Sequence, residues 1–258
     1  MSEEVICRKE GRVAHITINR EEALNALNSK IMQRLDELFI ELEFDQDVVA
    51  VVITGSGQKS FVAGADVKEI LDAGEERTPL ITKGQHIFSR IRNSSKVVIA
   101  AINGYALGGG LELALACDIR IASQNAKFGL PEAKLGLMPG YGGTQMLSRI
   151  CGVGMAKWMM FTGTMLGAAE AEQCGLVQKV CGMESLAEEA DGIARKIALN
   201  GPFALKAIKR AVNRGSELDI EEAMKVELEE YDKVAHSQDA IAGIEAFFAK
   251  KSPVFNGK

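Results

Sequence analysis

Three segments of the chain hold the residue types that could do chemistry, namely residues 60–66, 103–112 and 128–144. The clearest signal is the run Gly108, Gly109 and Gly110, which stands directly before a short apolar stretch. Consecutive glycines cost backbone entropy, so they indicate a positive φ angle or a close approach of the backbone. Where a strand meets a helix, such a turn presents backbone N–H groups at the positive end of the helix dipole. The run is therefore a candidate oxyanion site, although a tight packing turn explains the glycines alone equally well.

Two glutamates near this run could transfer protons. Glu112 lies one turn into an expected helix whose other positions, residues 111–116, are apolar or small. A carboxyl group in such a helix is partly desolvated, which raises its pKa toward a range useful for acid–base catalysis. Glu132 follows Pro131 in the third segment. Two carboxyl groups beside an anion site suit proton transfer next to a carbonyl group, whereas singly they could be a solvated glutamate and a capping acid.

The composition excludes several classes of protein. The chain has 258 residues, of which 47% are hydrophobic and 25% are charged, the balance of a soluble globular protein. The net charge of −5 and the absence of dense basic runs argue against a nucleic-acid partner. Apolar stretches end within about ten residues, too short to span a membrane. Residues 1–4 lack the apolar segment of a secretory signal.

The cysteines point to a reducing compartment. Their number is odd and no pair has CxxC spacing: Cys7, Cys117, Cys151, Cys174 and Cys181. We therefore expect reduced thiols in a cytoplasmic protein. The three histidines do not stand near a cysteine in the sequence, so we expect no metal site.

Hydrophobic patterns predict the elements that must position the reactive residues. Strands are expected at residues 5–8, 13–18, 48–54, 97–102 and 119–122, and helices at residues 29–44, 67–73, 80–92 and 111–116. Residues 55–66 are expected to be a loop and residues 104–110 a turn, with Ser29 as an N-cap. Four amphipathic helices follow without a strand, at residues 184–199, 202–214, 220–235 and 238–250. Buried strands that alternate with helices predict an α/β core, which is followed here by a helical C-terminal region.

The glycines and glutamates belong to a wider pattern that resembles the crotonase, or enoyl-CoA hydratase, superfamily. The resemblance begins at residues 23–27, includes all three segments, and continues through residues 162–163, 168–171 and 175–177 to the tail at 248–253. It therefore covers nearly the whole chain. It implies a crotonase-like spiral of repeated ββα units in residues 1–195. It also implies that residues 196–258 form a helical region that assembles homotrimers, often stacked into homohexamers.

The resemblance implies an acyl-CoA thioester as substrate and no metal or redox cofactor, coenzyme A being part of the substrate. In the family two backbone N–H groups hold the thioester oxygen, and Ala65 and Gly109 occupy the matching positions. Glu112 and Glu132 match the glutamates of the hydratase branch. We assign Glu112 mainly to the water and Glu132 mainly to the proton at C2, although the two could share both roles. Gly140 matches the glycine that helps to position the water. The implied substrate and CoA site comprises Ala23, Leu24, Ala63, Gly64, Ala65, Asp66, Gly108 and Gly109.

We therefore expect an enoyl-CoA hydratase of fatty acid β-oxidation. This lyase would add water reversibly, with syn geometry, to a short-chain trans-2-enoyl-CoA such as crotonyl-CoA, giving a 3-hydroxyacyl-CoA. A cyclic dienoyl-CoA hydratase, an enoyl-CoA isomerase and a non-catalytic acyl-CoA-binding member remain alternatives, and the pair of glutamates favours the hydratase. The chain departs from many relatives at Glu21, Val97 and Met146, and Met146 and Leu130 leave the shape of the acyl pocket open.

Overall fold

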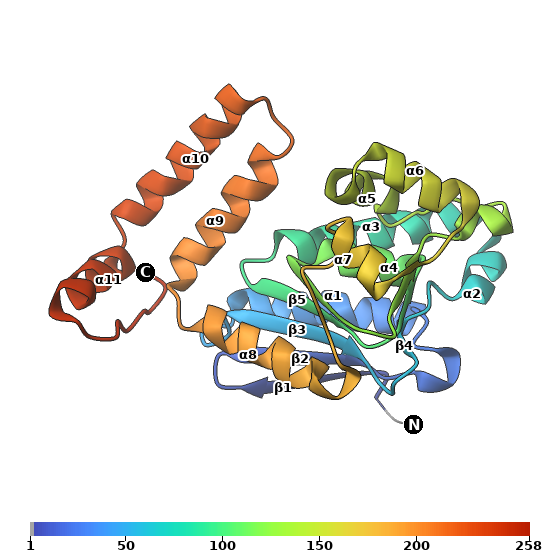
Figure 1. Cartoon of the computed structure of the whole chain (residues 1–258), viewed down its shortest axis with the longest axis horizontal. Coiled ribbons are helices and arrows are strands. Elements are labelled where there is room, and N and C mark those ends of the chain that lie inside the picture. Colours follow the sequence, from blue (N-terminus) through green and yellow to red (C-terminus); the bar gives the residue numbers. More distant parts are fainter. Residues whose placement is uncertain (1–2) are drawn as a thin grey trace.

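The middle of the chain repeats a strand–strand–helix unit, as the computed structural model of residues 3–258 shows (Figure 1). The first strands of successive units lie parallel in one sheet: β3 (Ala50–Gly55), β5 (Val97–Ile102) and β7 (Ile119–Ser123). The second strands lie parallel in another sheet: β4 (Ser60–Val62), β6 (Tyr105–Leu107) and β8 (Lys127–Gly129). The units are connected by α2 (Val67–Asp72), α3 (Arg77–Asn93) and α4 (Gly109–Ala116). The chain thus follows a spiral. Residues 1 and 2 of the N-terminal segment considered above lie outside the described residues.

Both sheets contain further strands: the larger sheet gains β1 and β2 before these units and β10 after them, and the smaller sheet gains β9. The larger sheet has the order β1–β2–β3–β5–β7–β10, and the smaller sheet has the order β4–β6–β8–β9. The added strands are β1 (Val5–Glu10), β2 (Val13–Ile18), β9 (Leu166–Gly167) and β10 (Lys179–Cys181). Strands β1 and β2 pair antiparallel, so the predicted N-terminal hairpin is confirmed.

Strand β3 is buried on both faces, which explains its unbroken run of β-branched residues. Val51 and Ile53 pack in the main apolar core, together with residues of α3 and of α1 (Ser29–Phe44). Val52 points to the opposite face, into a second cluster that includes Ala190 of α8 (Leu186–Ala198). Because alternate residues of a strand point to opposite faces, a strand covered by helices on both sides needs apolar residues at every position.

Three local predictions are wrong. Residues 55–66 contain β4, and residues 104–110 contain β6, where we expected a loop and a turn. A strand of three residues is too short for alternation to reveal it in the sequence. The N-cap of α1 is Asn28 rather than Ser29, because Asn28 Oδ1 accepts the hydrogen bond from the Ile31 N–H (2.8 Å).

From residue 184 onward the chain is helical, as predicted, whereas the three helices between β8 and β10 were not predicted. After β8 come α5 (Gly143–Cys151), α6 (Val153–Thr162) and α7 (Ala168–Gln173), and after α8 come α9 (Pro202–Gly215), α10 (Ile220–Ala235) and α11 (Gln238–Ala249). Helices α9 to α11 extend away from the sheets (Figure 1), whereas α8 packs on the larger sheet. The division of the chain at residue 195 stays a prediction. Within residues 3–258, no helix is both long and apolar enough to cross a membrane.

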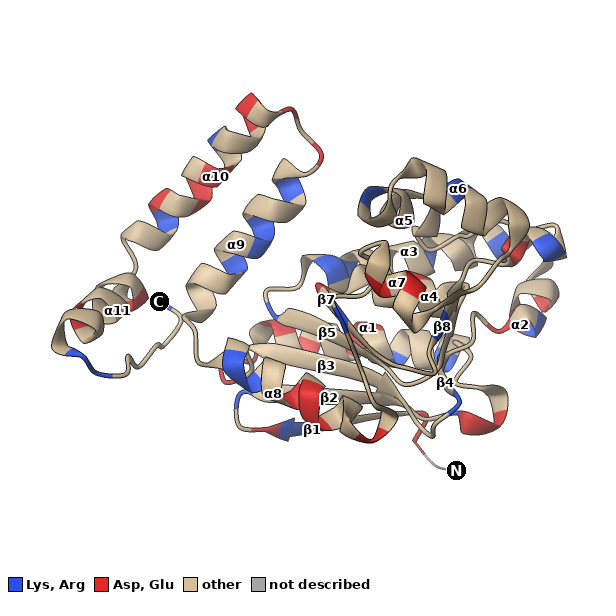
Figure 2. Ribbon diagram, viewed as in Figure 1, with Lys and Arg blue, Asp and Glu red and all other residues tan. Residues whose placement is uncertain are grey.

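Opposite charges line the hairpin of α9 and α10. Figure 2 shows basic residues along α9 and mainly acidic residues along α10. Arg214 of α9, for example, lies 3.3 Å from Glu229 and 3.5 Å from Glu230. Partly exposed pairs of this kind contribute little stability singly, but they fix which faces of the two helices meet.

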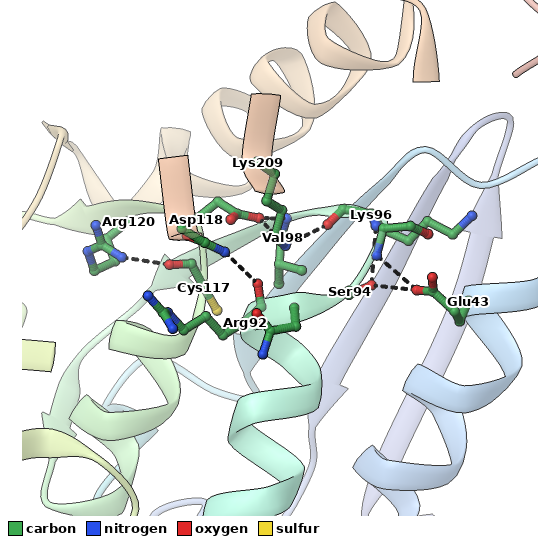
Figure 3. Close-up of polar contacts among 12 residues, drawn as sticks. Glu43, Arg92, Ser94, Lys96, Val98, Cys117, Asp118, Arg120 and Lys209 are labelled. Atoms are coloured by element: carbon green, nitrogen blue, oxygen red, sulfur yellow. Dashed lines mark hydrogen bonds and ion pairs between the residues drawn. The ribbon is translucent and has the colours of Figure 1, made fainter. Parts of the chain in front are cut away.

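A buried ion pair fastens α9 to the larger sheet (Figure 3). Lys209 Nζ donates to Asp118 Oδ2 (2.7 Å) and to the Lys96 carbonyl (2.9 Å). The same carboxylate oxygen accepts the Val98 N–H (2.7 Å) at the start of β5. The Lys209 side chain is only 7% exposed. Removing the lysine would therefore leave the Asp118 charge buried without its cation.

We predict that Lys209→Met lowers the free energy of unfolding by about 3–5 kcal/mol, the usual cost of breaking a buried ion pair from one side. Lys206→Met is the matched control, because Lys206 lies on the same helix but its pair with Glu43 is long (3.9 Å) and partly exposed. Such a pair is worth at most about 1 kcal/mol. Urea denaturation measures both variants, and equal losses would contradict the role given to Lys209.

Candidate active site

The reactive residues gather where the strands of the smaller sheet end. Ala65 follows the last residue of β4 by three positions, Gly108 directly follows β6, and Glu132 follows β8 by three positions. These strands are parallel neighbours, so their carboxyl ends lie at one edge of the sheet. Segments that are far apart in the sequence therefore meet there, which is the usual place for ligand sites in parallel sheets.

Ala65 and Gly109 place two backbone N–H groups next to each other. Gly109 is the first residue of α4, and the first N–H groups of a helix find no acceptor within that helix. A Cβ atom on Gly109 would lie 3.2 Å from the Ala65 nitrogen, so the two amides are neighbours. The α4 dipole adds partial positive charge at the same point. The arrangement can stabilise an oxyanion.

The neighbouring glycines allow this close approach. Gly108 has a φ of +51°, which favours glycine. A Cβ atom on Gly110 would lie 1.9 Å from the Val62 carbonyl oxygen, so a side chain there would force α4 away from β4. Tight packing and an anion site are thus not competing explanations of the glycine run, because the packing brings the Gly109 N–H beside Ala65.

Glu112 is buried in α4 with only 3% of its surface exposed. Its Oε1 atom accepts hydrogen bonds from the Tyr141 N–H (2.8 Å) and the Gly143 N–H (2.7 Å). Burial raises the pKa of the Glu112 carboxyl from 4.5 to about 7; the nearby charge of Glu132 adds to this, and the two amides oppose it. A carboxyl group with this pKa can take up and release a proton near neutral pH.

Glu132 begins a short 3-10 turn, Glu132–Leu135, next to the glycine run. A Cβ atom on Gly108 would lie 3.1 Å from Glu132 Oε1, which places this carboxyl beside the two amides. Its Oε2 atom is buried, and no group among residues 3–258 hydrogen-bonds to it. Burial raises the pKa of Glu132 above its ordinary value. A buried oxygen atom without a hydrogen-bond partner is typical of a functional site, where a bound ligand can supply the missing hydrogen bond.

Gly140 lies in the loop that holds Glu112. Its carbonyl accepts a hydrogen bond from Gln85 Nε2 (2.7 Å). The next residue, Tyr141, donates the N–H that binds Glu112. Gly140 is therefore close to the carboxyl that could activate a water molecule.

The segments implied for CoA are joined by backbone hydrogen bonds at the same edge. The Ala63 N–H donates to the Leu24 carbonyl (3.1 Å), and the Leu27 N–H donates to the Gly64 carbonyl (2.9 Å). Ala23 ends the short turn just before Leu24, which has a left-handed φ of 51°. This conformation is uncommon for leucine and is held by the surrounding hydrogen bonds.

Asp66 is engaged within the protein rather than turned toward a ligand. Its carboxylate accepts a hydrogen bond from Arg20 (2.8 Å), which lowers its pKa below the ordinary value. It also caps α2 by accepting the Lys68 N–H (3.1 Å). Any contact of this residue with a substrate is therefore expected to use its backbone.

Two buried asparagines that were not singled out from the sequence hold the chain leading to Ala65. Asn103 Nδ2 donates to the Gly55 carbonyl (2.9 Å), and Asn25 Nδ2 donates to the Ser60 carbonyl (2.8 Å). Satisfied buried amides of this kind fix a unique path for the backbone. Asn25 has a left-handed backbone conformation, with a φ of 60°. Asparagine adopts this conformation more readily than most residues, and this was the only feature of the sequence that could have pointed to Asn25.

The burial of Glu112 predicts how stability changes with pH. A carboxyl group whose pKa is higher in the folded state than in the unfolded state loses its stabilising contribution as the pH rises through the folded pKa, here about 7. Glu112→Gln keeps an acceptor oxygen and cannot ionise. We expect this variant to be more stable than the wild type by on the order of 3 kcal/mol at about pH 8 and by about 1 kcal/mol at about pH 5.

Urea denaturation of both proteins at the two pH values measures this difference. Glu75→Gln, at an exposed position, is the matched control and is expected to show no such pH dependence. A gain for Glu112→Gln that is the same at both pH values would show that ionisation of Glu112 does not oppose folding.

Comparison with known proteins agrees with this geometry. The family model described as enoyl-CoA hydratase/isomerase matches residues 8–258. The short-chain-enoyl-CoA hydratase of Clostridium acetobutylicum is 48% identical over 96% of this chain and 95% of its own. The crotonyl-CoA hydratase of Syntrophomonas wolfei is 43% identical over 99% of both chains.

The crystal structure of an enoyl-CoA hydratase from Bacillus anthracis superposes with a TM-score of 0.96 at 38% identity, covering 99% of this chain and 100% of that one. This match confirms the predicted crotonase-like α/β fold with its helical C-terminal region. The chain belongs to the enoyl-CoA hydratase/isomerase family.

Proposed function

We propose that the protein is an enoyl-CoA hydratase that adds water reversibly, with syn geometry, to a short-chain trans-2-enoyl-CoA such as crotonyl-CoA. The observation that carries this proposal is the placement of two glutamates, the buried Glu112 and the half-buried Glu132, beside the paired N–H groups of Ala65 and Gly109. The names of the relatives at 43–48% identity support the same reaction and the short chain. The product is a 3-hydroxyacyl-CoA.

The two amides stabilise the charge that develops on the substrate. Attack of water at C3 moves electrons through C2 to the thioester oxygen, which becomes an enolate oxygen. The Ala65 and Gly109 N–H groups donate hydrogen bonds to this oxygen, aided by the dipole of α4. Loss of one such donor typically costs about 2.7–4 kcal/mol of transition-state stabilisation.

The two carboxyl groups handle the protons. Glu112, as a carboxylate, orients the water beside Gly140 and takes its proton as the oxygen bonds to C3. Glu132, whose pKa is raised by burial, gives a proton to C2. Both carboxyls lie on the same side of the bound thioester in this account, which gives syn addition. The backbone of residues 23–24 and 63–66 binds the CoA part, and the reaction uses no other cofactor.

We predict that the roles of the two glutamates can be separated. Glu112→Gln and Glu132→Gln should each slow hydration of crotonyl-CoA by a factor of about 10² or more, the usual worth of a positioned acid or base. Exchange of the C2 proton of butyryl-CoA in heavy water needs only the group nearest C2 and the two amides. Glu132→Gln should therefore lose this exchange, while Glu112→Gln should retain a measurable part of it.

Absorbance of the conjugated thioester follows hydration, and proton NMR follows the exchange. Glu75→Gln, at an exposed position far from the glycine run in the sequence, controls for the substitution itself. The reverse ranking of the two variants would exchange the assigned roles. Equal loss of exchange in both would mean that the carboxyls act as one coupled pair.

We further propose a cytoplasmic homotrimer or homohexamer, in which residues 196–258 form the contacts between subunits. Helices α9 to α11 expose large apolar side chains that a lone chain would leave in water: Ile208, Val212, Met224, Leu228, Phe247 and Phe248. Exposed apolar surface of this extent usually marks an interaction site. The basic residues along α9 each pair with a carboxylate, so we do not propose a nucleic-acid partner.

Sedimentation equilibrium tests the assembly. We expect a trimer or a multiple of it at micromolar concentration, and we expect Phe248→Glu to shift the protein toward monomers because it places a charge in an apolar contact. Phe44→Glu, at a similarly exposed phenylalanine on α1, should leave the assembly intact. A wild type that is a stable monomer would contradict the proposal.

A further inference from the structure

A small cavity lies beside Ala65, one of the two residues with paired amides. Its volume is about 30 Å³, and its lining includes Ala65, Tyr141, the apolar side chains of Met32 and Ile87, and the polar or charged side chains of Asn28 and Glu69. A space of this size holds on the order of one or two water-sized groups. Because the cavity adjoins Ala65, one of the two residues proposed to bind the thioester oxygen, we expect the end of a bound acyl chain to approach it on the side of Tyr141.

The Tyr141 ring is held against α3 by an unusual residue. Gly84 lies in the interior of this helix, where glycine costs about 1 kcal/mol relative to alanine. A Cβ atom on Gly84 would lie 2.3 Å from Tyr141 Cε1, so any side chain there would displace the ring. Phe88, one turn further along α3, packs edge-on against the ring with a centroid distance of 5.3 Å. The ring contact is a physical reason for this glycine.

The opposite edge of the ring faces the oxyanion glycines. A Cβ atom on Gly109 would lie 3.3 Å from Tyr141 Cδ2 and Cε2. The Tyr141 backbone N–H meanwhile binds Glu112, which fixes the base of the side chain. The ring therefore stands between α3 and the reaction centre, with little freedom to move toward either.

We propose that Tyr141 is the end wall of the acyl pocket and that Gly84 is the seat for its ring, so that together they restrict the enzyme to short acyl chains. This assignment rests on the proposed hydratase function and adds to it the residues that set chain length. Neither residue is assigned to proton transfer or to the oxyanion.

The first test compares enoyl-CoA substrates of four, six and eight carbons. Each methylene group that a pocket cannot accept typically lowers kcat/KM by a factor of about 10 to 200, so the wild type should strongly prefer crotonyl-CoA. Tyr141→Ala removes the wall and should raise the ratio of kcat/KM for octenoyl-CoA over crotonyl-CoA by at least about tenfold. Tyr141→Phe keeps the ring and should keep the wild-type preference.

The second test probes the contact between the ring and its seat. Gly84→Ala should push the ring toward Gly109 and lower kcat/KM for crotonyl-CoA. In the Tyr141→Ala background, Gly84→Ala should not lower kcat/KM for crotonyl-CoA any further, because the ring that it would displace is absent. Non-additive effects of this kind identify residues that are in contact. Gly192→Ala is the matched control, since Gly192 is also inside a helix but a Cβ atom there would meet nothing within 4 Å.

Two results would overturn the proposal: an unchanged chain-length preference in Tyr141→Ala, or equal effects of Gly84→Ala with and without the ring. Failure of the hydratase function is recognised separately, as a wild type that hydrates no enoyl-CoA. In that case the dissociation constants of butyryl-CoA and octanoyl-CoA, measured by calorimetry for wild type and Tyr141→Ala, replace kcat/KM. If Tyr141 is the end wall, only Tyr141→Ala should bind octanoyl-CoA as tightly as butyryl-CoA. Thermal melting checks that each variant is folded.

Discussion

The site depends on the burial of one carboxyl group. Glu112 lies in a helix that is otherwise apolar, and an ionised carboxylate in such surroundings is costly unless it is hydrogen-bonded. The N–H groups of Tyr141 and Gly143 supply those bonds, so the loop that carries them must fold over α4. The same loop places Gly140 beside the carboxyl and the Tyr141 ring beside Gly109. One electrostatic requirement thus sets the positions of the proposed base, the proposed water site and the proposed wall.

The spiral is what makes such an arrangement possible. Each ββα unit contributes one strand to the smaller sheet, and each of these strands leads into a segment with a different proposed role. The segment after β4 carries Ala65, the segment after β6 carries the glycines and α4, and the segment after β8 carries Glu132. The larger sheet, covered on both faces by helices, supplies the rigid support. Precise placement of preorganised donors requires such a scaffold, because a shift of about 1 Å can cost a factor of 10² in rate.

The long strands and helices and the candidate glutamate could be predicted from the sequence, but the contacts between distant segments could not. The strand at residues 97–102 and the helix at residues 220–235 were predictable because their apolar patterns are long and regular. Glu112 stood out as a carboxylate within an apolar helix. Strands β4 and β6 were missed because three residues show no period, and their partners are set by distant parts of the chain. The proposed role of Gly84 could not be predicted from the sequence, because it depends on the contact with the Tyr141 ring, which only the structure shows.

The most direct test of the account is the pKa of Glu112 itself. Carbon-13 NMR of protein labelled at the glutamate carboxyl groups can follow each carboxyl through a pH titration, and Glu112→Gln identifies the resonance. The account predicts one resonance that titrates near 7, as burial in α4 requires, and that is missing from the variant. A Glu112 carboxyl that titrates near the ordinary value of 4.5 would show that the helix does not create a base for neutral pH.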